Sequence, residues 1–501
     1  MHARLTHIRS ELPPLLRLAL PLILGELGWT AMSVIDTVMV GRLPNSALSM
    51  AAASLAQVLF NIFVFGVGGI LLGLDPLISQ AFGAKQVPEA NRWFLHGLVL
   101  AVTLAAILTA IFTAGPMLMR HLPVDAAILN LAIPAMRGLN YGVLPLMLYF
   151  TLRRYLQAAH HTRPIAYALI SANLINAAGD WLLIFGHHFA LGSLTLNIPA
   201  FGVLGSSWST SFSRLYLFAF LLAALYLADR KQKYDLLKSL TTKATNTVQL
   251  QHLRKLFLLG APAGAGIFVE IGIFALVTVL IATLGPLALA GHEIALQCAS
   301  TTFMVPFAIS AATSVRVGHN LGRLRAHLSH QNNRESSSSN QNNLGAPGPD
   351  SRTRVSAEAT TLHAAPAAAG YSGILAGATI MLLFSALFLA IPTAIARLFT
   401  PDRAVIAAAV PLLLVAAGFQ FFDGIQINVT GALRGAGNTT APLLTQIICY
   451  WFIGMPLGTL LAFHFHLGAT GLWLGLLIAL TAAAAVLLAV WRNTTHKLQI
   501  P

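Results

Sequence analysis

The sequence predicts an all-α polytopic membrane protein, and its composition and its long apolar runs are the two observations behind that prediction. Of the 501 residues, 56% are hydrophobic and only 9% are charged, and the mean hydropathy is +0.73. About a quarter of the residues in soluble globular proteins are charged, so the chain lies outside that class. Because a helix satisfies its own backbone hydrogen bonds in lipid, we expect each apolar run to be helical.

Twelve apolar runs are long enough to span the membrane. A hydrocarbon core about 30 Å thick requires a helix of about 20 residues. We place the spans near 14–41, 48–75, 94–116, 128–152, 164–186, 200–228, 256–284, 287–318, 370–398, 404–432, 441–464 and 467–491.

The basic residues predict the orientation of these spans. With the N-terminus inside, most Lys and Arg residues fall in internal segments, and the external turns and adjoining span ends hold only Arg42, Arg120, Arg397 and Arg403. Positive charge gathers in cytoplasmic loops, so we expect both termini in the cytoplasm. The formal net charge of +14 then reflects topology in a lipid bilayer, which argues against a nucleic-acid partner.

Two polar stretches interrupt the spans. Residues 229–255 follow the sixth span and predict a cytoplasmic linker between an N-lobe at 1–228 and a C-lobe at 256–501. Residues 326–366 are rich in Ser, Asn, Gln, Gly and Pro. Such a segment has little apolar surface to bury, so we expect it to be a disordered cytoplasmic insert in the C-lobe.

The two halves repeat each other weakly. The segment SALSMAAASLAQ resembles LALAGHEIALQC, SQAFGAK resembles GHNLGRL, and QAAHHTRPIA resembles GAGNTTAPLL, in the same order and after corresponding spans. Six spans in each half make the copies parallel in the membrane. This arrangement of two pseudo-symmetric six-helix lobes is common among transporters, with the substrate path between the lobes.

Acidic residues at bilayer depth are the candidate functional groups. An uncompensated charge at this depth costs at least about 2.5–3.5 kcal/mol, so such residues usually face a cavity or the helix bundle. The carboxylates concerned are Glu26, Asp36, Asp180, Glu270 and Asp423.

Depth along the spans predicts which of these groups converge. Asp36 lies about five residues, and Asp180 about six, before the external ends of their spans, so at about 1.5 Å per residue they share a depth. Asn176 precedes Asp180 by four residues and therefore lies on the same helix face. In the other lobe, Glu270 and Asp423 differ in depth by about 7 Å, so their convergence is the weaker expectation.

Three segments carry a resemblance to a known family. They are VIDTVMVGRLPNSAL in the first span, SQAFGAKQVPEANRW after the second, and AGHEIALQCASTTFMVPFAISAATSVRVGHNLG in the eighth. In these segments the chain resembles the multidrug and toxic compound extrusion (MATE) family, NorM-like branch. The resemblance covers nearly the whole chain except 326–366. It implies the MATE fold and a secondary antiporter of a bacterial inner membrane that expels organic cations in exchange for protons or sodium ions.

The resemblance also implies roles for the acids. Asp36, Asn176 and Asp180 match the family's N-lobe proton or cation cluster, and Glu270 with Asp423 match its C-lobe cation-binding acids. The chain departs from the pattern at Asp180, where NorM-like relatives tend to have an amide and an acid is typical of the DinF-like branch. It departs again at Phe419, where a tyrosine would be expected, and both departures leave the coupling ion open.

The mechanism that we expect is alternating access by a monomer with no cofactor other than the coupling ion. A cationic, amphiphilic substrate would be held by carboxylates and by aromatic side chains such as Tyr141 and Phe419, because aromatic faces attract cations. Glu26 is a further N-lobe candidate. Burial disfavours a charged carboxylate, which makes protonation at physiological pH feasible. Sodium, which needs several oxygen ligands, is the rival coupling ion at either cluster.

Two other classes of function remain as alternatives. A lipid-linked oligosaccharide flippase of the same superfamily would need a cationic cavity for pyrophosphate, and the acid-rich, arginine-poor spans argue against it. An integral-membrane enzyme would need a catalytic histidine or nucleophile at a membrane face, and the sequence contains no such constellation. We therefore expect a transporter and not an enzyme.

Overall fold

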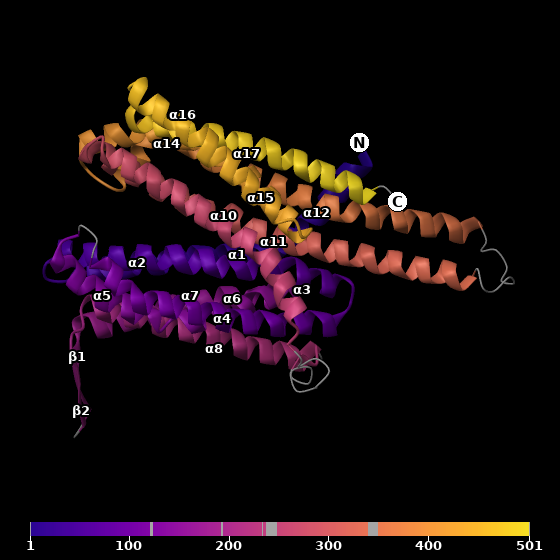
Figure 1. Ribbon diagram of the computed structural model, residues 1–501, viewed down its shortest axis with the longest axis horizontal. Coiled ribbons are helices and arrows are strands. Elements are labelled where there is room, and N and C mark those ends of the chain that lie inside the picture. Colours follow the sequence, from indigo (N-terminus) through magenta and orange to yellow (C-terminus); the bar gives the residue numbers. More distant parts are fainter. Residues whose placement is uncertain are drawn as a thin grey trace. The chain divides into compact units, whose positions relative to one another are not determined.

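Long apolar helices make up most of the protein in the computed structural model, which describes residues 2–120, 124–191, 194–232, 234–236, 248–338 and 349–499 (Figure 1). Among these residues, eleven helices are long and apolar enough to cross a membrane. The pair α5 and α6, bent by 46°, makes a twelfth if it forms one span. The predicted all-α polytopic class is confirmed, with eleven or twelve candidate spans among the described residues.

The first half of the chain contains eight helices of the α type among the described residues, together with one 3₁₀ turn and one hairpin. Their bounds are α1 (His2–Val40), α2 (Ser46–Gly68), η1 (Gly69–Gly73), α3 (Leu74–Gly83), α4 (Val87–Met119), α5 (Ala126–Asn140), α6 (Val143–Ala158), α7 (Arg163–Phe185), β1 (His187–Leu191), β2 (Leu194–Ile198) and α8 (Val203–Gln232).

The second half contains longer helices and two π-helical segments, η2 and η3. The bounds are α10 (Leu250–Ala282), α11 (Pro286–Ser338), α12 (Pro349–Ala390), α13 (Pro392–Arg397), α14 (Arg403–Gly435), α15 (Thr440–Gln446), η2 (Ile447–Gly454), α16 (Met455–Thr459), η3 (Leu460–His464) and α17 (Gly468–Gln499). The start of α14 is capped by Asp402, whose Oδ1 accepts from the Ala404 backbone N–H at 2.8 Å, which satisfies an otherwise unpaired donor.

The chain packs into two compact units that interleave along the sequence. Unit 1 contains 1–20, 75–90 and 269–501, and unit 2 contains 21–74 and 91–268. This partition differs from the lobes expected at 1–228 and 256–501. One reason lies in unit 2, where Gly260 on α10 approaches η1 so closely that a Cβ would lie 1.8 Å from the Ile70 carbonyl oxygen. Glycine is the residue that permits such a backbone approach.

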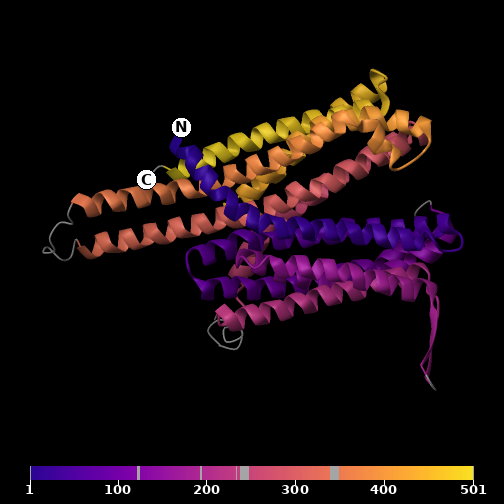
Figure 2. The same ribbon diagram turned by 180° about the vertical axis from the view of Figure 1, so that it is seen from behind.

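Unit 2 is built around α8. This helix packs against α7 and against α5 and α6, which follow each other as the two halves of one bent pair (Figures 1 and 2). In the second half of α8 the buried side contains Leu217, Leu221 and Leu225, whereas in the first half it is formed by small hydroxyl residues. These buried residues are Ser206, Ser207, Ser209, Thr210, Ser211 and Ser213.

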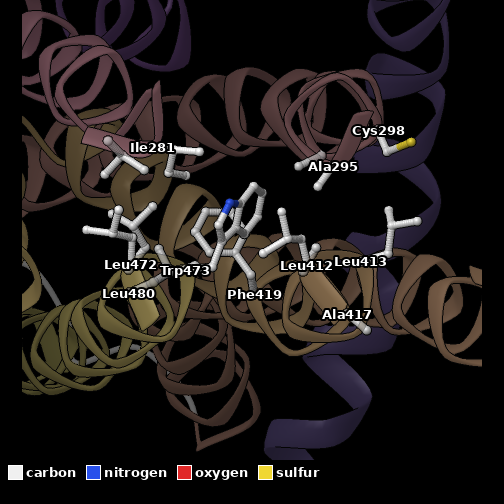
Figure 3. Packing of buried hydrophobic residues seen from close by; sticks show 14 of the residues in the cluster. Ile281, Ala295, Cys298, Leu412, Leu413, Ala417, Phe419, Leu472, Trp473 and Leu480 are labelled. Atoms are coloured by element: carbon white, nitrogen blue, oxygen red, sulfur yellow. The ribbon is translucent and has the colours of Figure 1, made fainter. Parts of the chain in front are cut away.

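Unit 1 is built around α14, which packs against α11, α12 and α17. Its largest apolar cluster surrounds Trp473, one of the largest fully buried side chains. Figure 3 shows Trp473 beside Phe419 and among aliphatic side chains of α10, α11, α14 and α17. The short helix α3 also belongs to this unit, where Asp75 forms a buried ion pair with Arg434 at 3.2 Å.

Two features differ from what the sequence predicts. An antiparallel hairpin, β1 with β2, pairs His187 with Ile198, in a segment expected to be a simple external turn. The second is the insert 326–366, for which we expected disorder. In the described residues α11 continues to Ser338 and α12 begins at Pro349, and 339–348 lie outside them. Extending an existing helix is far easier than nucleating one, so a polar stretch can continue a membrane helix.

Candidate functional site

In unit 2 the structure brings together the carboxyl groups of Asp36 on α1 and Asp180 on α7. The two side chains lie within hydrogen-bonding reach of each other. Asp180 is fully buried, whereas Asp36 is half-buried. Two ionised carboxylates only accept hydrogen bonds, so a bond between them requires that one carries a proton. The pair is therefore arranged to share a proton.

Polar side chains of α7 and α8 surround this pair. Thr210 Oγ1 lies 3.2 Å from Asp36 Oδ2, to which it can donate. Asn176 faces Asp36, and its Nδ2 donates to Ser209 Oγ at 3.2 Å. Ser209 Oγ in turn donates to the Asn176 carbonyl oxygen at 2.8 Å, which fixes α7 against α8.

The oxygen atoms of the pair keep unused capacity to accept hydrogen bonds. Neither carboxyl oxygen of Asp180, nor Oδ1 of Asp36, has a geometrically good donor among the described side chains and backbone groups. Buried acceptors without donors are costly. A proton, a cation or water would each supply the missing interaction, so these oxygens are a candidate binding position.

Glu26 does not join this cluster. It lies ten residues before Asp36 on α1, a separation of about 15 Å along a helix, and its Oε1 accepts a hydrogen bond from Arg153 Nη2 in a buried ion pair. The fourth span was expected to end near residue 152, which would place Arg153 in the internal segment that follows it. The structure corrects that placement, because α6 continues to Ala158 and Glu26 neutralises the arginine within the helix bundle.

Tyr141 lies at the bend between α5 and α6. Its side chain is 76% exposed, in contrast to the buried Asp180. The bend itself falls between α5 and α6 at Tyr141 and Gly142, so this tyrosine marks the discontinuity of the fourth span.

In unit 1 the structure brings Glu270 on α10 and Asp423 on α14 near enough for their charges to interact. Asp423 is buried and Glu270 is half-buried. Glu270 Oε2 accepts a hydrogen bond from Gln446 Nε2 at 3.3 Å. Tyr450 lies near both acids, on the π-helical segment η2 that begins directly after Gln446. Such π-helical segments are frequent at functional sites.

Phe419, the aromatic candidate of this region, is a core residue. Its ring lies 6.1 Å from Phe274 and 6.1 Å from Trp473, in edge-on contacts (Figure 3). The Trp473 indole N–H donates to His292 Nδ1 at 3.1 Å. The expected tyrosine hydroxyl is thus absent at position 419, and the tyrosine near the acids comes from Tyr450 on another helix.

Sequence reasoning missed three polar neighbours of the acids. Thr210 belongs to a serine-rich run in which no periodic pattern distinguishes one hydroxyl from the next. Gln446 and Tyr450 are four residues apart, a spacing that places two polar groups on one helix face. That spacing in an otherwise apolar span was the available signal.

Comparisons with known proteins agree on one family. A family model described as MatE matches residues 21–182, 262–330 and 363–460. The chain is 31% identical to a probable multidrug resistance protein NorM from Mesorhizobium japonicum, over 96% of this chain and 94% of the relative. It is 30% identical to the multidrug resistance protein NorM from Vibrio vulnificus, again over 96% and 94%. Multidrug resistance protein PmpM from Pseudomonas aeruginosa is 30% identical over 96% of this chain and 91% of that protein.

Solved structures share the fold. The eukaryotic MATE transporter AtDTX14 superposes with a TM-score of 0.75 at 19% identity, covering 98% of this chain and 99% of that one. An outward-facing multidrug resistance MATE transporter of the MOP superfamily superposes with a TM-score of 0.80 at 18% identity, covering 97% and 96%. The expected MATE fold is confirmed.

Proposed function

Because this chain belongs to the MatE family of membrane transporters, we propose that it exports cationic, amphiphilic drugs or toxic organic compounds in exchange for protons. Membership of the family makes it a transporter and not an enzyme. Relatives named multidrug resistance proteins support the multidrug part of the proposal.

The observation that carries the proposal is the contact between Asp36 and Asp180. The proton and an organic cation would neutralise the same negative charge of the carboxyl pair. Binding of the organic cation therefore displaces the shared proton. Protonation from the outside then releases the cation there. Proton and cation thus compete for one site, which is the basis of antiport by alternating access between the two lobes.

The acids of the C-lobe form the second site of this mechanism. Glu270 and Asp423, with Gln446 and Tyr450 beside them, offer several oxygen atoms around one position. Sodium prefers such a set of hard oxygen ligands. Sodium at this site is the rival to proton coupling at Asp36, Asn176 and Asp180.

We place both termini on the cytoplasmic side of a bacterial inner membrane and treat the protein as a monomer. The excess of Lys and Arg in the internal segments supports this orientation. Substrate then moves from the cytoplasm to the outside, while protons move inward down their gradient.

Ion-gradient-driven efflux from proteoliposomes tests the proposal. Purified protein is reconstituted into lipid vesicles, and the vesicles are loaded with a fluorescent organic cation. A proton gradient, a sodium gradient or no gradient is then imposed across the vesicle membrane. We expect efflux with the proton gradient, and no efflux with the sodium gradient or without a gradient. Strict dependence on sodium would overturn proton coupling, and equal efflux without any gradient would overturn antiport.

A further inference from the structure

Arg214 on α8 is a buried positive charge in the N-lobe site whose role neither the family nor the motifs assign. Only 2% of the residue is exposed. Its Nη1 donates to the Leu139 carbonyl oxygen at 3.4 Å, and its Cζ lies 4.3 Å above the centre of the Phe60 ring. Gly142 makes room for it, because a Cβ there would lie 2.8 Å from Arg214 Cδ.

The guanidinium group is only partly satisfied where it lies. Arginine carries five N–H donors and does not lose its proton in proteins. Its Nε has no geometrically good acceptor among the described groups, and the bond to Leu139 is long for an N–H···O contact. A charge buried with so few acceptors is costly unless an opposite charge lies nearby.

The opposite charge comes from the shared-proton pair. Thr210, whose Oγ1 lies 3.2 Å from Asp36 Oδ2, precedes Arg214 by four residues on α8, so the two buried residues lie on the same helix face. Arg214 therefore lies one turn from the pair, close enough for its charge to act on Asp36. The other charged side chains on α8 and on the helices packed against it do not face the pair. Arg153 pairs with Glu26, and Arg154 donates to Gln157. Arg137 is exposed, and the remaining charged residues lie at helix ends, namely Arg163, Asp229, Arg230 and Lys231. No charged residue occurs in α2.

We propose that Arg214 is the permanent countercharge of the Asp36–Asp180 pair and that it restricts the site to singly charged organic cations. With one shared proton, the pair carries one negative charge and Arg214 cancels it. When a monovalent cation replaces that proton, which leaves to solvent, the two carboxylates are balanced by Arg214 and the cation. Both states are neutral, as a site of low dielectric constant favours.

A divalent cation disturbs this balance. With Arg214 present, it would leave the fully ionised pair with one uncompensated positive charge. Without Arg214, two ionised carboxylates would match a divalent cation, whereas a monovalent cation would need a proton to remain. Arg214 is thereby a specificity-determining residue, an inference that rests on the proposed exchange of cation for proton at this pair.

Ethidium and propidium provide a matched test. The two dyes share one ring system, and propidium carries an additional quaternary ammonium group. Binding of each dye to purified full-length protein in detergent is measured for wild type, Arg214→Gln, Arg214→Lys and Arg137→Gln. We expect wild type, Arg214→Lys and Arg137→Gln to prefer ethidium, and Arg214→Gln to shift the ratio of the two dissociation constants toward propidium by about tenfold or more.

Proton release provides the second readout. In weakly buffered solution with a pH indicator, we expect one proton per ethidium bound to wild type. We expect between one and two protons per propidium bound to Arg214→Gln, because both carboxylates must be ionised to match its two positive charges. The lysine variant keeps the charge with a different shape, so it separates charge from packing if Arg214→Gln proves unstable. If Arg214→Gln does not fold, Arg214→Met is used as the neutral variant, and its folding is checked by size-exclusion chromatography. We expect Arg214→Met to lose the preference for ethidium as well.

The outcomes separate this inference from the proposed function. An unchanged ethidium-to-propidium ratio in a folded Arg214→Gln, with ethidium binding still abolished by Asp36→Asn, would overturn the role of Arg214 and leave the function standing. Ethidium binding that is the same in wild type and Asp36→Asn would overturn the site itself. A shifted ratio in Arg214→Lys equal to that in Arg214→Gln would assign the effect to shape, which also contradicts the proposal.

Discussion

The carboxyl groups of Asp36 and Asp180 come from helices α1 and α7 and lie within hydrogen-bonding reach of each other. Their surroundings are polar but contribute few donors, because Ser209 is engaged with Asn176 and Thr210 can donate one hydrogen bond at a time. We therefore expect that a proton or an organic cation supplies the interaction that Asp36 Oδ1 and the Asp180 carboxyl oxygens lack.

The first prediction concerns Asp36. Substitution by asparagine keeps the shape of the side chain and removes the titrating group, so Asp36→Asn should reduce proton-driven efflux to the level of protein-free vesicles with little loss of protein. The measurement is dye efflux from proteoliposomes, with protein content checked on a gel. Thr37→Val, at the next position and exposed, serves as the control and should retain wild-type efflux. Full proton-driven efflux by Asp36→Asn would remove the N-lobe pair from the mechanism.

The second prediction concerns the acids of the C-lobe. Glu270→Gln and Asp423→Asn should slow turnover under an ion gradient while leaving proton release at the N-lobe pair intact, because the two clusters belong to different units. Gln446→Leu removes the donor to Glu270 and should produce a smaller decrease than either acid variant. Turnover is compared under proton and sodium gradients. If a sodium gradient increases turnover in neither the variants nor the wild type, the C-lobe acids do not couple transport to sodium.

Depth along the spans predicted which acids meet but not what surrounds them. Asp36 and Asp180 each lie about five or six residues from an external end, and equal depth was enough to pair them. The positions of Thr210 and Arg214 depend on the rotation of α8 about its own axis. The buried side of α8 is formed by Leu217, Leu221 and Leu225 in its second half, but by serine and threonine over 206–213. The half that holds Thr210 therefore has no apolar stripe that reveals the rotation.

Charge in the sequence was more misleading than apolarity. Arg153 and Arg154 end an apolar window and therefore resembled the start of a loop, yet α6 continues through both because Glu26 on another helix neutralises Arg153. The same limit applies to Glu11, for which the sequence predicted no partner. Its carboxylate accepts from Arg316 Nη2 at 2.6 Å and from Asn320 Nδ2 at 3.1 Å. Long-range ion pairs of this kind leave no local pattern.

The third prediction concerns the buried ion pair of Glu26 and Arg153. Removing one partner of a buried pair typically costs about 3–5 kcal/mol, because a charge remains without compensation, whereas replacing both by apolar residues is often neutral. Glu26→Gln should therefore lower the melting temperature of the purified protein, and Glu26→Met combined with Arg153→Met should restore much of it. Thermal unfolding in detergent measures both. A stable Glu26→Gln that has lost efflux would instead place Glu26 among the transport groups.

The last prediction concerns the insert, whose useful boundaries follow from its contacts. Asn320 Nδ2 donates to the Ala365 carbonyl oxygen at 3.2 Å as well as to Glu11, so the end of the 326–366 segment is part of the packing of unit 1. Replacing only 332–360 by a Gly/Ser linker of about ten residues, which is flexible enough to join the two helices, should leave transport and melting temperature unchanged.

A second deletion extended through Ala365 provides the contrast. It removes the acceptor of Asn320 and should lower the melting temperature, because a buried donor loses its partner, typically at about 1–3 kcal/mol. Both variants are compared with wild type by thermal unfolding and by dye efflux from proteoliposomes. Loss of efflux in the shorter replacement, with the melting temperature preserved, would show that the polar extensions of α11 and α12 take part in gating.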